Sequence, residues 1–163
     1  ATTEIYTILF VGSVKMCIRD SIKRYIGVEV MGMTACPCAM ETIREACGRE
    51  LGMTHNQRNV VTIIMESRGE IDADDLIAIA EASMSSPTYE ILKRADEKEV
   101  VMYAHQHPKF VEDVVRDLLT NILHKYRDLP DDVEVVVRSK SLESIHKHDA
   151  FAERTTTIGE LKN

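Results

Sequence analysis

The stretch PKFVEDVVRDLLTNILHKY, at residues 108–126, decides the fold class. Its apolar or aromatic residues include those at positions 111, 114, 115, 118, 119, 122, 123 and 126. On a helix with 3.6 residues per turn, these positions fall on one face. Pro108 suits the first turn of a helix, where a backbone N–H is not needed. We therefore expect a long amphipathic helix that starts at Pro108 and packs on a hydrophobic core.

Strands are expected on both sides of this helix. Segments rich in β-branched residues or with alternating polarity lie at 22–33, 59–67, 133–139 and 148–158. Shorter helical patterns begin at Pro37 and at Asp72, and Ser86-Pro87 opens a short turn. The resulting order, strand, strand, helices, strand, strand (ββααββ), predicts an α+β fold in which an antiparallel sheet carries helices on one face.

Composition narrows the class of protein. The 163 residues include 20 Lys and Arg against 27 Asp and Glu, which gives a formal net charge of −7. An acidic domain is poorly suited to nonspecific nucleic-acid binding, which depends on basic patches. No apolar run approaches the roughly 20 residues that span a bilayer. We expect one cytoplasmic domain with reduced cysteines, no nucleic-acid partner and no membrane segment.

Residues 1–21 read differently from the rest of the chain. The hexapeptide MCIRDS, residues 16–21, is what one reading frame of a transposase adapter used in sequencing libraries would encode. We expect 1–21 to be a foreign or disordered segment and the natural domain to be 22–163. An ordinary strand followed by a loop is the alternative.

Two cysteines stand at the start of the first helical pattern. Cys36 and Cys38 flank Pro37, and a thiol at a helix N-terminus is favoured as thiolate, the form that binds metal or attacks carbon. Simple packing of two small side chains explains the pair equally well. Cys47 lies in the apolar stripe of the same helix and is expected to pack. His55, in a polar segment just before a strand, would supply a second metal ligand beside a cysteine.

Glu112 occupies an unusual position on the long helix. With Val111 at zero and about 100° per residue, Glu112 falls at about 100°, between Leu119 and Leu123. A carboxylate is thus expected on the buried side, where Glu is rare unless paired. An ion pair with Arg116, or a first-turn acid that favours the helix dipole, are the alternatives.

A second polar cluster lies near the C-terminus. His146 and His148 share a face if the segment is a strand, and two imidazoles can transfer protons near neutral pH or bind metal. Glu143 is close enough in sequence to polarise one imidazole. A polar strand end is the alternative. By themselves, Asp96-Glu97 form a surface charge run, and His105 and His107 are expected to be structural residues of a loop.

Together these segments resemble one family. The matching stretches are GMTACPCA at 32–39, THNQR at 54–58, SMSSPTYEILKR at 83–94, PKFVED at 108–113, and ESIHKHDA at 143–150 followed by ER at 153–154. They resemble the GTP cyclohydrolases of the type IB/MptA group, and the archaeal MptA branch more than the bacterial one. The chain contains no phosphate loop, dinucleotide fingerprint, GxSxG or HExxH.

The resemblance implies a tunnelling fold, GTP as substrate, a homo-oligomer, and a metal: Fe²⁺, with Mn²⁺ or Zn²⁺ as alternatives. It implies Cys36, His55 and Glu97 as metal ligands and Glu112 as the carboxylate that binds guanine. Glu143, His146 and His148, with Cys36, match the catalytic group. The implied products are formate and a dihydroneopterin phosphate, cyclic in the MptA branch, for pterin or methanopterin-type cofactors.

The sequence also departs from that family. A preceding tunnelling-fold half is missing, the segment between Cys38 and His55 is shortened, and Ala95 and Lys147 stand where prolines are expected. The leading hypothesis is the C-terminal half of a GTP cyclohydrolase. The alternatives are a catalytically incomplete metal-binding or assembly fragment, and another tunnelling-fold enzyme, such as a nitrile reductase with a cysteine nucleophile.

Overall fold

A computed structural model of the chain describes residues 23–47 and 52–163. The expectation that 1–21 are foreign or disordered lies outside the described residues. The strands are β1 (Tyr25–Ala35), β2 (Asn56–Glu66), β3 (Ser86–Pro87), β4 (Glu134–Leu142) and β5 (Ala150–Thr157). The helices are α1 (Pro37–Cys47), α2 (Ala73–Ser83), α3 (Arg94–Gln106), α4 (Val111–Tyr126) and α5 (Ile158–Leu161).

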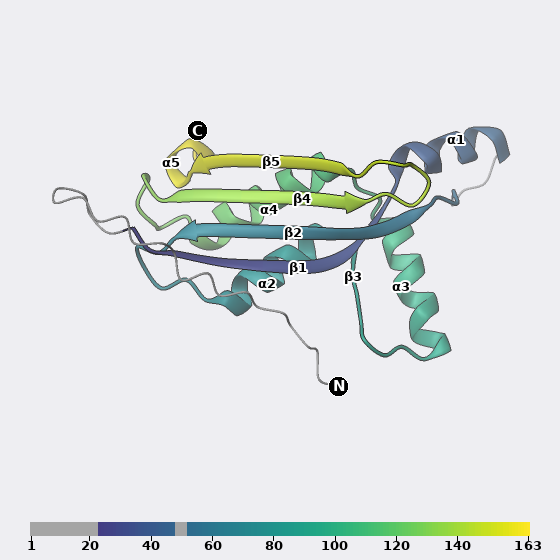
Figure 1. Cartoon of the computed structure of the whole chain (residues 1–163), viewed down its shortest axis with the longest axis horizontal. Coiled ribbons are helices and arrows are strands. Elements are labelled where there is room, and N and C mark those ends of the chain that lie inside the picture. Colours follow the sequence, from purple (N-terminus) through teal and green to yellow (C-terminus); the bar gives the residue numbers. More distant parts are fainter. Residues whose placement is uncertain (1–22, 48–51) are drawn as a thin grey trace.

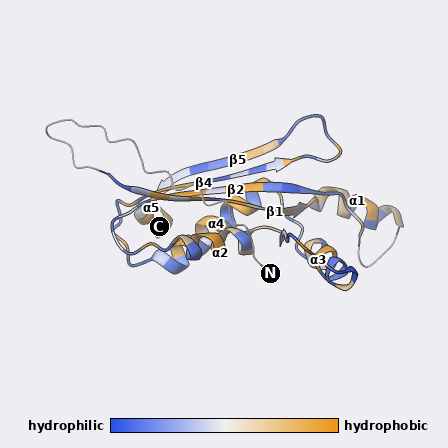
Figure 2. Ribbon diagram, turned by 60° about the horizontal axis from the view of Figure 1, so that its bottom comes forward, coloured by the Kyte–Doolittle hydropathy of each residue, from blue (hydrophilic) through white to orange (hydrophobic). Residues whose placement is uncertain are grey.

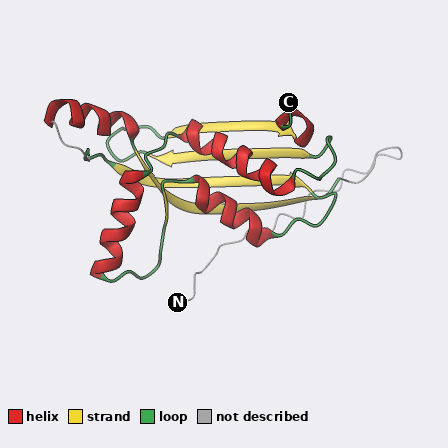
Figure 3. Ribbon diagram, turned by 180° about the vertical axis from the view of Figure 1, so that it is seen from behind, coloured by secondary structure: helices red, strands yellow, loops and turns green. Residues whose placement is uncertain are grey.

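The strands form one five-stranded sheet in the order β3-β1-β2-β4-β5, with every neighbouring pair antiparallel. The long helices α2 and α4 pack side by side on one face of it, α2 mainly against β1 and α4 against β4 and β5 (Figures 1 and 3). Seen from the edge in Figure 2, both helices lie on the same side of the sheet. The predicted α+β fold, an antiparallel sheet with helices on one face, is confirmed.

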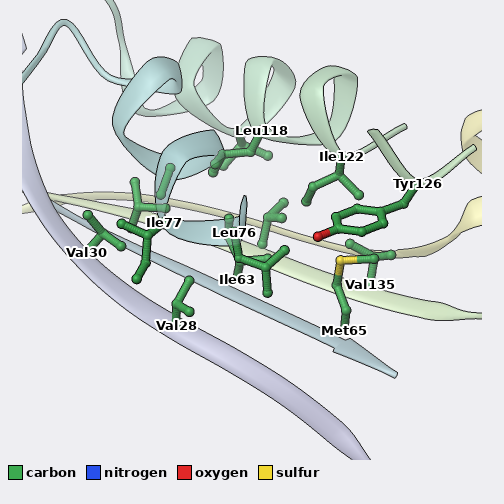
Figure 4. Packing of buried hydrophobic residues seen from close by; sticks show 14 of the residues in the cluster. Val28, Val30, Ile63, Met65, Leu76, Ile77, Leu118, Ile122, Tyr126 and Val135 are labelled. Atoms are coloured by element: carbon green, nitrogen blue, oxygen red, sulfur yellow. The ribbon is translucent and has the colours of Figure 1, made fainter. Parts of the chain in front are cut away.

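The core lies between the sheet and these two helices (Figure 4). Alternate residues of the strands face the helices, because successive side chains of a strand point to opposite faces. The buried cluster includes Val28, Val30, Val61, Ile63, Met65, Val135 and Val137 from the sheet and Leu76, Ile77, Val114, Leu118 and Ile122 from the helices. The apolar stripe of 108–126 therefore has the predicted role.

The helix starts follow local chemistry. Asp72 caps α2 as expected, since its Oδ1 accepts the N–H of Asp74 at 3.0 Å. The long helix begins at Val111 and not at Pro108, because Phe110 is the N-cap and its N–H donates to the Asp113 side chain at 2.9 Å. Pro108 lies before the helix, where its fixed φ shapes the incoming chain.

Three local predictions were wrong. Ser86-Pro87 is not a turn but the short strand β3, paired with Gly32 and Met33 of β1. Helix α3 was not predicted at all, because Ala104 is its one buried residue and there is no apolar stripe to detect. Cys47 is exposed and not packed, since α1 extends beyond the end of the sheet (Figure 1).

No helix in the described ranges 23–47 and 52–163 has the length and apolar character needed to cross a bilayer.

A polar cluster ties β1 to β4 at the end of the sheet opposite α1. Glu134 accepts hydrogen bonds from Lys23, at 2.7 Å, and from the Tyr25 hydroxyl. These donors stabilise the carboxylate and lower the pKa of Glu134 from its ordinary value of 4.5, with Lys23 as the larger cause. Beside them, the buried Glu66 pairs with Arg68 at 2.6 Å.

This cluster predicts a pH dependence of stability. Because the pKa of Glu134 is lower in the folded protein, its contribution is present above pH 4.5 and is lost as the pH falls through the folded-state value. Glu134→Gln should therefore lower the urea midpoint at pH 7, and the difference from wild type should shrink towards zero in acid. The exposed Glu70→Gln is the control. A difference that persists at the lowest pH would contradict this role for the carboxylate.

Candidate active site

One cavity of about 410 Å³ lies at the end of the sheet where α1 and α4 begin. Antiparallel pairing brings the end of β1, the start of β2, the end of β4 and the start of β5 together at this end of the sheet. Its lining residues are Thr34, Cys36, Cys38, Ala39, His55, Gln57, Lys109, Phe110, Val111, Glu112, Ser141, Glu143, Ile145, His146, His148 and Ala150. Segments more than a hundred residues apart in sequence thus share one cavity.

Most of the predicted site residues meet here. The cavity is lined by Cys36, His55, Glu112, Glu143, His146 and His148, and Glu97 is absent from its lining. The structure therefore gathers the predicted guanine-binding and proton-transfer groups and two of the three predicted metal ligands.

Backbone hydrogen bonds hold Cys36 beside His55. The N–H of Cys36 donates to the carbonyl of His55 at 3.1 Å, and the Thr54 hydroxyl donates to the carbonyl of Cys36 at 2.7 Å. Cys36 directly precedes α1, and its carbonyl accepts the N–H of Met40 at 3.3 Å. The half-buried thiol therefore stands at a helix N-terminus, as predicted, next to the predicted second ligand.

Three imidazoles of the cavity lining, His55 among them, lie close to one another. The rings of His55 and His146 meet edge to face with centroids 6.3 Å apart, and those of His146 and His148 stack at 5.3 Å. Nδ1 of His55 lies 3.1 Å from the Ser144 hydroxyl. Rings this close can pass a proton through a bound molecule or water.

The two C-terminal histidines do not share the face of a strand. The ladder of β4 and β5 ends at the pair Ser141 and Ala150, so residues 143–149 form a loop. The predicted strand at 148–158 begins at Ala150 instead. Within this loop the two rings stack on each other, and both residues line the cavity.

Glu112 is exposed, contrary to the expectation that it lies on the buried side of its helix. It belongs to the first turn of α4, which overlies the cavity and not the core. The alternative of an ion pair with Arg116 is also wrong. Arg116 pairs with Asp113 at 3.0 Å and reaches only the backbone carbonyl of Glu112. Glu112 is thus an exposed residue of the cavity lining.

Lys109 fixes the start of α4 over the cavity. Its N–H donates to the carbonyl of Ala35, and its ammonium donates to the carbonyl of Ser83 at 2.9 Å and pairs with Asp117 at 2.7 Å. Asp117 is thus an ion-pair partner and not merely a solvated residue. These contacts join the start of α4 to the end of β1 and to the end of α2. They therefore help to fix the position of Glu112, which lies in the first turn of α4.

Three further residues line the floor of the cavity and were not predicted from the sequence. Gln57 Nε2 donates to the Thr34 hydroxyl at 3.4 Å and to Glu143 Oε1 at 3.5 Å. Ser141 lies beside them on β4. The sequence did contain a signal for them. Each is a polar residue at a strand position that faces the helices, where an apolar residue is the norm.

The three predicted metal ligands are not assembled in this chain. Glu97 is in the first turn of α3, eight residues before His105, or about 12 Å along the axis. His105, in the last turn of α3, is the residue of this helix that contacts the segment before β2, with Nε2 3.3 Å from the Thr54 carbonyl. Among the residues that the structure describes, no three His, Cys, Asp or Glu side chains are grouped to hold a metal ion. Cys36 and His55 therefore lie together without Glu97, which stays a predicted third ligand.

Comparison with known proteins gives one consistent result. The family model described as "Type I GTP cyclohydrolase folE2" matches residues 1–152. A GTP cyclohydrolase MptA of Methanothermobacter thermautotrophicus is 46% identical over 160 residues, which covers 86% of this chain and 50% of the relative. The MptA proteins of Methanococcus aeolicus and Methanocaldococcus jannaschii are 43% and 42% identical, again with 52% and 51% of their lengths matched. The chain spans about half the length of these relatives.

The contacts of Lys109 predict its contribution to stability. Lys109→Met removes a charged donor whose side chain is 18% exposed and leaves the Ser83 carbonyl without this partner. The free energy of unfolding should fall by about 1–3 kcal/mol, as measured by urea denaturation. Lys98→Met on α3, where the side chain is 69% exposed, should change it by less than about 0.5 kcal/mol. Equal effects of the two substitutions would rule out this role for Lys109.

Proposed function

The chain belongs to the type I GTP cyclohydrolase family of the folE2 type, and from this membership we propose that it forms the site of a GTP cyclohydrolase that opens the guanine ring at C8 and releases formate. The observation that carries the proposal is the cavity itself. It joins a carboxylate, a cluster of imidazoles and a helix-terminal thiol, which come from four separate stretches of the chain.

Glu112 is proposed to bind the guanine. Guanine presents N1–H and its 2-amino group side by side, and one carboxylate can accept both as charge-assisted hydrogen bonds. Adenine has a different donor pattern, so the same group selects guanine. The position of Glu112 supports this role, because its side chain is exposed, lines the cavity and has no ion-pair partner among the described residues.

His146, His148 and Glu143 are proposed to move protons. Hydrolysis at C8 needs a proton at the ring nitrogen that leaves, and a second hydrolysis needs another to release formate. Imidazoles transfer protons efficiently near neutral pH. The stacked rings of His146 and His148, and the contact of Glu143 with Gln57, support a shared proton-transfer group on one wall. The product would be a dihydroneopterin phosphate for pterin or methanopterin-type cofactors.

Cys36 and His55 are proposed to bind a divalent metal, Fe²⁺ in the MptA branch, with Mn²⁺ and Zn²⁺ as alternatives. Thiolate and imidazole are suitable donors for these ions. The backbone hydrogen bond between the two residues supports the pair. Glu97 stays a predicted third ligand, and it lies outside the cavity that Cys36 and His55 line.

The sheet is proposed to be a tunnelling-fold unit that joins further copies of the chain. Within residues 23–47 and 52–163, the outer side of β1 pairs with β3 only at Gly32 and Met33, and β5 is the other edge of the sheet. Such edges present backbone groups that can pair with another strand. This supports a homo-oligomer. From the family membership we further propose GTP as the ligand and a cytoplasmic location.

The proposed function is tested by formate release. The anaerobic, ferrous-loaded protein is incubated with GTP, and formate and a pterin-like chromophore are measured. Glu112→Gln should weaken GTP binding by about tenfold or more, because it replaces a charged acceptor with a neutral amide that also presents a donor. Glu99→Gln, an exposed residue of α3, is the control.

Two outcomes count against the proposal. If the full-length protein of the natural gene released no formate from GTP, the activity would be wrong. If Glu112→Gln bound GTP as tightly as the wild type, the guanine-binding role would be wrong even with the activity intact.

A separate prediction concerns the metal. Cys36→Ala and His55→Ala should lose most of the iron that the wild type retains after gel filtration, as measured by elemental analysis. Cys47→Ala is the matched control, since Cys47 is exposed and lies outside the cavity lining. Wild-type iron content in both site variants would reject the ligand pair.

A further inference from the structure

The face of the sheet that carries the core changes character at the cavity. Along β2 the helix-facing residues are Met65, Ile63 and Val61, followed by Asn59 and Gln57; along β4 they are Val135 and Val137, followed by Ser139 and Ser141. Thr34 takes the corresponding place on β1. We call Thr34, Gln57, Asn59, Ser139 and Ser141 the polar floor. These residues lie on the sheet face that carries the core, where apolar side chains are the norm. Three of them, Thr34, Gln57 and Ser141, line the cavity.

Two residues of the polar floor that line the cavity each have a buried side-chain atom without a hydrogen-bond partner. Ser141 is 1% exposed, and neither its Oγ nor Oε1 of Gln57 has a hydrogen-bond partner among residues 23–47 and 52–163. Both residues line the cavity. A buried polar atom without a partner costs free energy, so most such atoms in proteins are satisfied. A ligand in the cavity is the simplest partner for both.

The chemistry of Glu143 fixes which atom of Gln57 is free. An ionised carboxylate only accepts hydrogen bonds, so the amide nitrogen of Gln57 must face Glu143. The same nitrogen also reaches the Thr34 hydroxyl. The carbonyl oxygen of Gln57 is then the unpartnered atom and offers an acceptor. The Ser141 hydroxyl can rotate and offers a donor.

We infer that Gln57 and Ser141 form a polar subsite that binds the purine nucleotide from the sheet side, opposite the proposed contact with Glu112. The inference rests on the proposed function. With N1–H and one N–H of the 2-amino group assigned to Glu112, the base keeps, apart from its second amino N–H, only acceptors, and these match the Ser141 hydroxyl. The remaining donors of the nucleotide are sugar hydroxyls, and these match Oε1 of Gln57.

Ser139 supplies a matched control two residues along the same strand. Its hydroxyl donates to Oδ1 of Asn59 at 3.0 Å, both residues are fully buried, and neither lines the cavity. Ser139→Ala leaves the Asn59 carbonyl without its partner and should destabilise the protein. Ser141→Ala removes a hydroxyl that has no partner and should not.

The experiment measures two quantities for each variant, GTP affinity by equilibrium dialysis and stability by the urea midpoint. Ser141→Ala should bind GTP about fivefold more weakly, as expected for one lost hydrogen bond, with an unchanged or higher urea midpoint. Ser139→Ala should show the opposite pattern, a lower midpoint with wild-type affinity. Gln57→Met keeps the length of the side chain without its polar atoms and should also weaken GTP binding.

Each contrary outcome has a distinct meaning. If the wild type binds GTP and both Ser141→Ala and Gln57→Met bind it equally well, the subsite is wrong and the proposed function stands. Equal losses of affinity in Ser139→Ala and Ser141→Ala would also overturn it, because the effect would then be structural. If the wild type binds no GTP, the proposed function fails, and the subsite that rests on it fails with it.

Discussion

The two-residue repeat of side chains along β1, β2 and β4 is the constraint on which the rest of this structure depends. Cross-strand partners share a face, so Thr34 opposite Gln57 and Asn59 opposite Ser141 continue the surface that carries the core. A slip of one residue in either pairing would turn both the core valines and the polar floor to the opposite face. Folding of the core and construction of the cavity are therefore set by one register.

The antiparallel order explains how short, distant stretches meet. The chain leaves β1 and enters β2 at the same end of the sheet, and it passes from β4 to β5 there as well. The end of β1, the start of β2 and the loop after β4 therefore lie together. At that end of the sheet, a backbone hydrogen bond joins Cys36 to His55 and extends the ladder beyond its last pair, Ala35 with Asn56. The thiol and the imidazole are thus placed by backbone geometry. Their relative position does not depend on flexible side chains alone.

The cavity end combines features that weaken a core. Polar residues occupy core positions, Lys109 is largely buried between α2 and α4, and α1 and α3 extend beyond the sheet with few buried residues. The opposite end has a continuous apolar core and the cluster around Glu134. Stability is concentrated at one end and chemistry at the other, the usual division where function requires exposed or unpartnered groups.

The sequence by itself determined the elements that bury an apolar face. The stripe from Val111 to Tyr126, the Asp72 cap and the four long strands are local patterns, and the family motifs identified six residues that do line the cavity. Only the tertiary structure decided what depends on neighbours. An angle on a helical wheel places Glu112 beside Leu119, but the first turn of α4 has a cavity beneath it and not a core. Helix α3 buries one residue, so its sequence has no apolar stripe that would predict it. Glu97 lies in its first turn and outside the cavity that Cys36 and His55 line. The unpartnered atoms of Gln57 and Ser141 are likewise invisible in one dimension, because a hydrogen bond is missing only when everything around the atom is known.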